Sequence, residues 1–266
     1  MSNIAWDLPE EAAAAGLLAE AGIDRVDLAP GKYFPDPAAA SDAEIARVRH
    51  WWEQRGFTIE GMQGLLFGTT GLNLFADAQD TMLDRLDAVC RIAAGLGARA
   101  LTFGSPRQRD RSGLDDASTD RIARSFFARL GDRAEAHGVI VCLEPAPVMY
   151  GGNFLIGTAD TADFVARLGH PAIMLQLDVG ALAANGEAVA ETIAAVASVI
   201  GHVHASEPGL VPLGDAGADH AGAAPALRRA VPDHTVTIEM ARPSGEDPLV
   251  ALVRAVGLAR TTYGSA

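Results

Sequence analysis

The segment Val139-Ile-Val-Cys-Leu-Glu144 is a run of five apolar residues closed by a carboxylate. It follows Gly138, a residue typical of the end of a helix, and its length and branched residues favour a buried strand. The same pattern returns in the segments that end at Asp178, His204 and Glu239. Strand-like runs of this kind alternate with longer amphipathic stretches from end to end, which predicts a repeated strand–helix unit.

Eight such runs are found, and they predict the strands 3–6, 25–29, 58–63, 100–104, 139–144, 173–178, 201–205 and 235–240. The helical stretches between them have recognisable ends, such as the capping box of Ser41 and Glu44. With no linker or break in composition, the chain is predicted to be an α/β protein, a single (β/α)8 TIM barrel over residues 1–266. A doubly wound open sheet would usually carry a Gly-rich turn after its first strand, and Trp6-Asp-Leu-Pro9 is no such turn.

Composition narrows the function. The formal net charge of −13 argues against a nucleic-acid partner and against an anionic membrane surface, because both are bound mainly by Lys and Arg. A local cationic patch could still bind an anionic small molecule. The two cysteines, Cys90 and Cys142, are expected to be buried and reduced. No apolar run approaches ~20 residues and no signal peptide is evident, so we expect a soluble cytoplasmic protein.

The polar residues that close the last four strands carry the chemistry we predict. In TIM barrels the active site lies at the C-terminal ends of the strands. Strand alternation lets Glu144, Asp178, His204 and Glu239 converge there. Three crowded carboxylates repel one another unless a cation lies among them, and three oxygens with one imidazole suit Mn, Mg, Co or Zn. A lone carboxylate after a strand is more often a helix cap, but four consecutive strand ends favour one divalent metal site.

Two further histidines lie near this end of the barrel. His202 precedes His204 by two residues, so it shares the same face one layer deeper and is expected to be a hydrogen-bonded core histidine. His220 lies in the loop after the strand 201–205. It either reaches the substrate or begins a helix after Asp219.

A cationic segment, Gly104-Ser-Pro-Arg-Gln-Arg-Asp-Arg111, leaves the strand 100–104, and Lys32 follows the strand 25–29. At the catalytic end such groups would bind a phosphate or carboxylate of the substrate, although solvated loop charges are the alternative. The loop 64–77 is apolar and could be a lid or a cover for the rim. The residues predicted to bind substrate are Lys32, Gln63, Arg107, Arg109, Glu207 and His220.

The sequence resembles the sugar phosphate isomerase/epimerase superfamily, the xylose isomerase-like barrels, over nearly the whole chain. The motifs that carry the resemblance are Leu143-Glu-Pro145, Tyr150-Gly-Gly-Asn-Phe154, Leu177-Asp-Val-Gly180, His202-Val-His-Ala-Ser-Glu-Pro208 and Ile238-Glu-Met240. Met62-Gln-Gly-Leu-Leu-Phe-Gly68 and Gly104-Ser-Pro-Arg-Gln-Arg109 are similar to segments of one branch of the superfamily.

The resemblance implies the activity. In the ketose 3-epimerases of this superfamily, the glutamates that correspond to Glu144 and Glu239 form the acid/base pair. One removes a proton beside a carbonyl while the metal stabilises the enediolate, and the other returns a proton on the opposite face. A cation is needed because a C–H beside a carbonyl is otherwise too weak an acid for a carboxylate. We therefore expect a metal-dependent isomerase or epimerase of carbohydrate metabolism that acts on a sugar or sugar derivative.

The chain departs from the superfamily pattern at three positions. Many members have a His three residues after the metal aspartate, where this chain has Ala181. The epimerases of free ketoses have a Glu at the position of Tyr150 and an Arg at the position of Leu210. These departures argue against a simple ketohexose as substrate and leave the four predicted ligands intact.

Two other functions remain open from the sequence. A metal-dependent dehydratase or lyase begins with the same proton abstraction. A non-catalytic accessory subunit that binds sugar is less favoured, because Glu144 and Glu239 are both present. The related DNA-repair barrels of the endonuclease-IV type need metal histidines on earlier strands, and the strands 25–29, 58–63 and 100–104 offer none.

Overall fold

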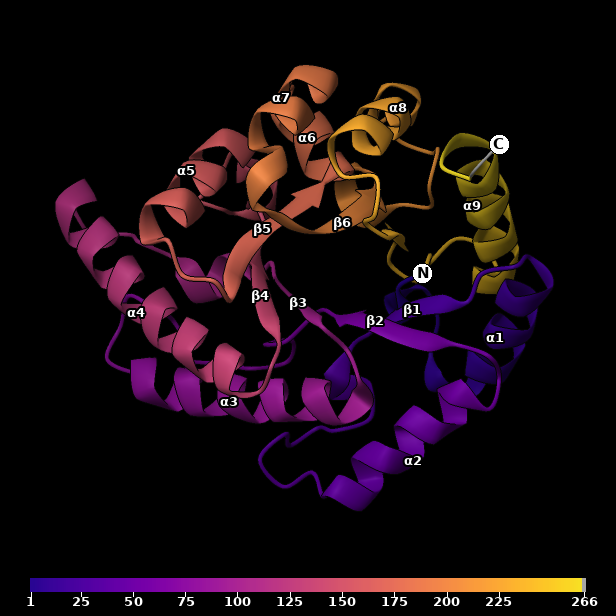
Figure 1. The fold of residues 1–266 in the computed structure, drawn as a ribbon, viewed down its shortest axis with the longest axis horizontal. Helices are drawn as coiled ribbons and strands as arrows, with labels where there is room; N and C mark the ends of the chain where they lie inside the picture. The colour runs from indigo at the N-terminus through magenta and orange to yellow at the C-terminus, as the bar shows by residue number, and fades with distance from the viewer. Residues whose placement is uncertain (265–266) are drawn as a thin grey trace.

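Segments of four to seven residues form the strands of this protein. In the computed structural model, which describes residues 1–264, seven parallel strands pair in chain order and curve into a barrel (Figure 1). They are β1 Arg25–Leu28, β2 Thr58–Met62, β3 Ala100–Phe103, β4 Ile140–Leu143, β5 Ile173–Asp178, β6 Ile200–Ser206 and β7 Val236–Glu239. The prediction of a TIM barrel is confirmed, and seven of the eight expected strands form within one or two residues of their expected bounds.

The prediction of a first strand at residues 3–6 is wrong. Asn3–Ala5 forms a short 3-10 helix, because the Ser2 hydroxyl accepts a hydrogen bond from the Ile4 N–H and favours a turn over a ladder. The barrel is instead closed by a single parallel bridge between Ser2 and Asp27. The Ser2 N–H donates to the Ile238 carbonyl at 2.8 Å, so the first two residues lie between β7 and β1.

Helices surround the sheet (Figure 1). Within the described part of the chain they are α1 Glu11–Glu20, α2 Asp42–Glu53, α3 Gln79–Leu96, α4 Asp116–Ala136, α5 Thr158–Leu168, α6 Val179–Asn185, α7 Val189–Val196, α8 His220–Ala230 and α9 Pro248–Thr262. Six further 3-10 turns lie in the loops: η2 Leu8–Glu10, η3 Pro30–Lys32, η4 Pro106–Arg109, η5 Val148–Tyr150, η6 Ala197–Val199 and η7 Pro208–Leu210. The capping box of Ser41 and Glu44 begins α2 as expected.

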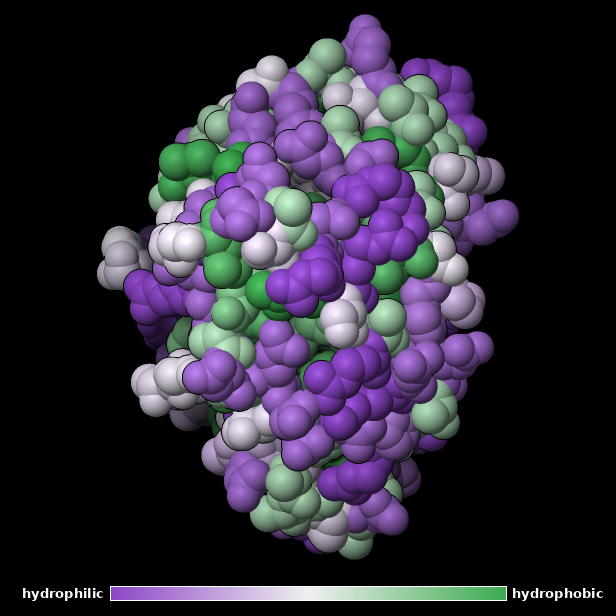
Figure 2. Space-filling model, turned by 90° about the vertical axis from the view of Figure 1, so that its left-hand side faces the viewer, coloured by the Kyte–Doolittle hydropathy of each residue, from purple (hydrophilic) through white to green (hydrophobic). Residues whose placement is uncertain are grey.

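The outer face of the helices is polar. Figure 2 shows mostly hydrophilic side chains on the side of the molecule where α4 lies, with apolar ones in small separate patches. Ion pairs join neighbouring helices there, as in Arg133–Asp84 between α4 and α3 and Arg167–Asp120 between α5 and α4, both at 2.9 Å. Within residues 1–264, no helix combines the length and apolar character needed to cross a bilayer.

The interior of the barrel below the strand ends is tightly packed around Gly201 of β6. A Cβ atom at this glycine would lie 2.6 Å from the Met174 Cβ and 2.8 Å from the Cys142 Sγ. Both neighbours are inward-facing residues of β5 and β4, and Cys142 is a buried free thiol as expected. The glycine therefore lets three neighbouring strands approach closely beneath the site.

We expect Gly201→Ala to destabilise the fold by about 1–3 kcal/mol, the usual result of overpacking a filled core. Gly257→Ala is the matched control, because Gly257 lies in α9 and a Cβ there would meet nothing within 4 Å. This control should be neutral or stabilising by up to about 1 kcal/mol, since Ala is the better helix former. Chemical denaturation measures both. Equal stability of the two variants would contradict the packing argument.

Candidate metal centre

The strand ends bring the four predicted ligands together. Glu144 follows β4, Asp178 ends β5, His204 lies in β6 and Glu239 ends β7. One ligand atom from each lies within 4.8 Å of the others. The His204 Nδ1 is 3.3 Å from the Glu239 Oε2 and 3.7 Å from the Glu144 Oε1. The β5–β6 register sets Asp178 directly beside His204, which explains why these two groups meet.

The donor set fits a divalent cation. Among the described residues, neither the Glu144 Oε1 nor the His204 Nδ1 has a hydrogen-bond partner, although both atoms are buried. Burial of such atoms without partners is costly. Metal bonds of about 2.0–2.2 Å place two ligands of one ion at most ~4.4 Å apart, so small shifts would bring all four groups onto one ion.

The electrostatics of the cluster point the same way. Burial, together with the charges of Glu144 and Glu239, raises the pKa of Asp178 to about 8. Burial also raises the pKa of Glu144, against the opposing effect of His204. Burial would lower the pKa of His204, but the Glu239 charge and the hydrogen bond with Asp27 raise this pKa well above its usual value. Protons therefore neutralise the cluster where no cation does.

This competition predicts the pH dependence of metal binding. A cation must displace the protons held by groups with raised pKa values, so affinity should rise as pH increases toward about 8. For each proton displaced, the rise is about tenfold per pH unit below that pKa. Titration calorimetry with Mn²⁺ in buffers of different ionisation enthalpy measures both affinity and protons released. A dissociation constant that does not change between about pH 6 and about pH 8 would contradict this account.

Neighbouring groups orient the carboxylates. The Asp178 Oδ2 accepts from the Ser206 hydroxyl at 2.6 Å, and its Oδ1 caps α6 by accepting from the Ala181 N–H at 2.5 Å. The Gln63 side-chain amide donates to the Glu239 Oε1 at 2.6 Å. Gln63 was expected to bind substrate, and the structure places it against a predicted ligand.

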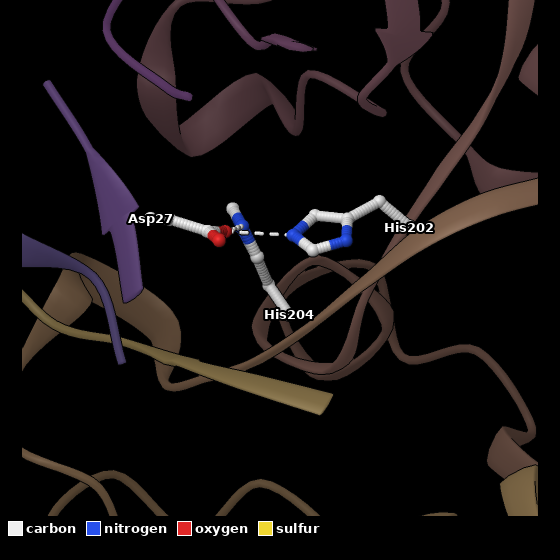
Figure 3. Close-up of side chains that lie close together, drawn as sticks. All are labelled: Asp27, His202 and His204. Atoms are coloured by element: carbon white, nitrogen blue, oxygen red, sulfur yellow. Dashed lines mark hydrogen bonds and ion pairs between the residues drawn. The ribbon is translucent and has the colours of Figure 1, made fainter. Parts of the chain in front are cut away.

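Asp27 is a buried group of this centre that the sequence analysis missed. Its Oδ2 lies 2.7 Å from the His202 Nε2 and 3.3 Å from the His204 Nε2 (Figure 3). All three side chains are buried, and His202 is a hydrogen-bonded core histidine as expected. Burial would raise the pKa of Asp27, but the two histidines outweigh it and hold this pKa well below its usual range. A carboxylate on Nε2 leaves the Nδ1 lone pair of His204 free to bind a metal.

We expect Asp27→Asn to weaken metal binding about 10- to 100-fold, the usual effect of losing the carboxylate behind a metal histidine. Asp42→Asn is the matched control, because the Asp42 side chain is 97% exposed. Calorimetry with Mn²⁺ gives the affinities, and thermal melting shows whether each variant is folded. A folded Asp27→Asn protein with wild-type affinity for Mn²⁺ would show that Asp27 does not support metal binding.

A cavity of about 230 Å³ opens on this centre. Glu144, Asp178 and Glu239 line it, whereas His204 is fully buried behind them. The rest of the lining comes from the segments that follow the strands, and it includes Tyr150 of η5, Ala181 of α6 and Leu210 of η7. The three positions at which the chain departs from the superfamily pattern thus all lie on the cavity wall.

Residues 15–257 match the model of the xylose isomerase-like TIM barrel family. The chain belongs to this family. Similar solved structures include a D-psicose 3-epimerase with D-tagatose from Clostridium cellulolyticum H10, at 18% identity over 96% of this chain and 94% of that chain, with a TM-score of 0.80. A 3-keto-D-glucoside 4-epimerase from E. coli matches at 16% identity over 98% of each chain, with a TM-score of 0.78.

An AP endonuclease of family 2 from Brucella melitensis is also similar, at 19% identity over 94% of this chain and 95% of that chain, with a TM-score of 0.74. At such identities these likenesses establish the fold. The comparison with curated proteins found no match.

In this xylose isomerase-like barrel, the cationic residues predicted to bind substrate lie outside the lining of the cavity. Arg109 is buried, and its Nη2 donates to the Glu144 backbone carbonyl at 2.6 Å. Arg107 is exposed on η4. The Lys32 ammonium donates to the carbonyls of Asn3 and Trp6, so it anchors the N-terminal segment. Contacts of these side chains with substrate stay a prediction.

Glu207 and His220, also predicted to bind substrate, organise the loop after β6. The Glu207 carboxylate accepts from the backbone N–H groups of Gly214 and Ala218 and lies 3.2 Å from the His220 Nε2. His220 begins α8 after Asp219, the second of its two expected roles. Their contact with substrate likewise stays a prediction.

Proposed function

We propose that this protein is a divalent-metal-dependent isomerase or epimerase that acts on a sugar or sugar derivative by proton abstraction beside a carbonyl. One observation carries the proposal: Glu144 and Glu239 come from non-adjacent strands, flank the His204 Nδ1 at 3.7 and 3.3 Å, and both line the cavity. Similar structures, among them a D-psicose 3-epimerase and a 3-keto-D-glucoside 4-epimerase, support sugar epimerase chemistry.

The two glutamates divide the work in this proposal. An ion of Mn, Mg, Co or Zn, held by Glu144, Asp178, His204 and Glu239, would supply positive charge beside the substrate oxygens. One glutamate removes the proton from the carbon next to the carbonyl, and the other delivers a proton to the opposite face or to a neighbouring carbon. The bond from Gln63 fixes the Glu239 carboxylate, and Gly104 leaves room for Glu144, whose Oε2 would lie 2.0 Å from a Cβ at that position.

Solvent exchange tests the proposal. In deuterated water with Mn²⁺, a substrate carbon next to the carbonyl should take up deuterium, as measured by NMR. Glu144→Gln and Glu239→Gln should each lower this exchange at least ~100-fold, because the amide keeps the shape but removes the base. Since both residues are predicted ligands, metal content is measured in the same samples, with Asp178→Ala as the variant expected to lose most of the metal.

Other outcomes distinguish the alternatives. Turnover without deuterium uptake, with release of water or an aglycone, would assign the protein to the lyases. Full activity of both Gln variants with metal bound would reject the assigned roles. Sugar binding without any turnover or exchange would favour an accessory subunit.

A further inference from the structure

The wall of the cavity is apolar wherever it faces away from the carboxylates. Besides Glu144, Asp178 and Glu239, Tyr150 is the one lining residue of the described chain with a polar side chain. Its hydroxyl already accepts a hydrogen bond from the Gly209 N–H at 2.6 Å. The remaining lining side chains come from proline, alanine, leucine and glycine.

The backbone of this wall offers few donors. Three of its residues are prolines, Pro106, Pro145 and Pro147, which have no N–H group. The N–H groups of Ala146, Ala181 and Leu210 donate to Leu155, Asp178 and Glu207 at 2.8, 2.5 and 2.9 Å. Apart from the Tyr150 hydroxyl, which keeps its own proton to donate, hydroxyl groups of a free ketose chain would find few replacement donors on this wall, and this disfavours their binding.

The wall is held in a backbone conformation that the sequence does not favour. Leu155 and Leu210 both have φ of +53°, and they are the non-glycine residues with positive φ in the described chain. Leu210 presents its side chain to the cavity, and the Leu155 carbonyl holds Ala146. Bulky side chains are rare in this region of φ, which glycine or asparagine would occupy more easily. Leucine at position 210 keeps the wall apolar at a conformational cost.

The size of the cavity suits a ring with a small polar head. A cavity of about 150 Å³ accepts benzene, so about 80 Å³ of the 230 Å³ remains for a hydroxyketone beside the carboxylates. The apolar surface continues outward along η5. Val148 and Met149, which lie between the lining residues Pro147 and Tyr150, are 66% and 58% exposed.

We propose that the substrate carries an apolar, ring-sized group next to its hydroxyketone head, and that Tyr150, Ala181 and Leu210 bind this group. The proposal rests on the proposed function, which supplies the head that faces Glu144 and Glu239. It narrows the substrate class from sugars in general to derivatives with an alkyl or aryl substituent.

Three probes test it on the protein with excess Mg²⁺. Hydroxyacetone is the head alone, 2-hydroxyacetophenone adds a phenyl ring, and D-fructose adds a polar chain. Burial of a phenyl group should make 2-hydroxyacetophenone bind about 10- to 100-fold more tightly than hydroxyacetone, and more tightly than D-fructose, as measured by NMR titration. Equal or tighter binding of D-fructose, or no binding of any probe, overturns the proposal.

Leu210→Asn tests the wall itself. Asparagine tolerates positive φ, so this change adds a polar group without new backbone strain. The dissociation constant of hydroxyacetone divided by that of 2-hydroxyacetophenone measures the preference for the phenyl ring. Leu210→Asn should lower this ratio at least about fivefold. Val253→Asn, at a residue of α9 that is 53% exposed, should keep the wild-type ratio. A wild-type ratio in a folded Leu210→Asn protein overturns the proposal.

Deuterium exchange, followed in the same samples, separates this inference from the proposed function. A phenyl preference without exchange into any probe would support the apolar wall and count against isomerase chemistry. Deuterium exchange into D-fructose without a preference for the phenyl probe would support isomerase chemistry and count against the apolar wall.

Discussion

The buried carboxylates of Asp178 and Glu239 and the partly buried carboxylate of Glu144 surround the imidazole of His204, and the strand ends of the barrel hold them there. A protein interior tolerates such a cluster only with compensating positive charge, supplied by protons or by a cation. The raised pKa values of Asp178 and His204 express this requirement. Parallel strands meet it because their ends deliver one group each at the same level, and Asp178 and His204 are partners in the β5–β6 register.

The strands that carry the predicted ligands could be predicted because the run of residues that marks each strand is local in the sequence. The run Ile173–Asp178 forms a strand at its expected bounds, since six consecutive residues that are apolar except for Gln176 and Asp178 suit a strand covered on both faces. The first strand was not predictable in the same way. Its place is taken by one bridge at Ser2, whose pairing depends on β1 and β7, far away in the sequence. Local hydrogen bonding at Ser2 then favours the turn that follows.

The same distinction applies to the site. The meeting of Glu144, Asp178, His204 and Glu239 could be predicted because each closes a strand-like run, and their role as metal ligands stays a prediction. Asp27 escaped prediction because it lies inside a strand, between Val26 and Leu28, and its partners are about 175 residues away. A charged residue within a buried strand was the available signal. The contacts of Arg109 and Glu207 were equally inaccessible, because both side chains are held by backbone groups of loops whose paths only the folded chain defines.

The predicted ligands and the cavity wall therefore come from different parts of this barrel. The strands place the predicted ligands, and the packing at Gly201 and the bonds of Asp27 lie beneath them. Segments that follow the strands form the wall of the cavity. The hydrogen bond from the Gly209 N–H to the Tyr150 hydroxyl joins η7 to η5, two turns that lie far apart in the sequence. Because hydrogen bonds of the segments after the strands hold the wall, and strand register does not, we expect changes of its side chains to leave the predicted ligands in place. Under the proposed function, the four predicted ligands beside an apolar Ala181 and Leu210 would direct the same proton chemistry to a different substituent on the substrate.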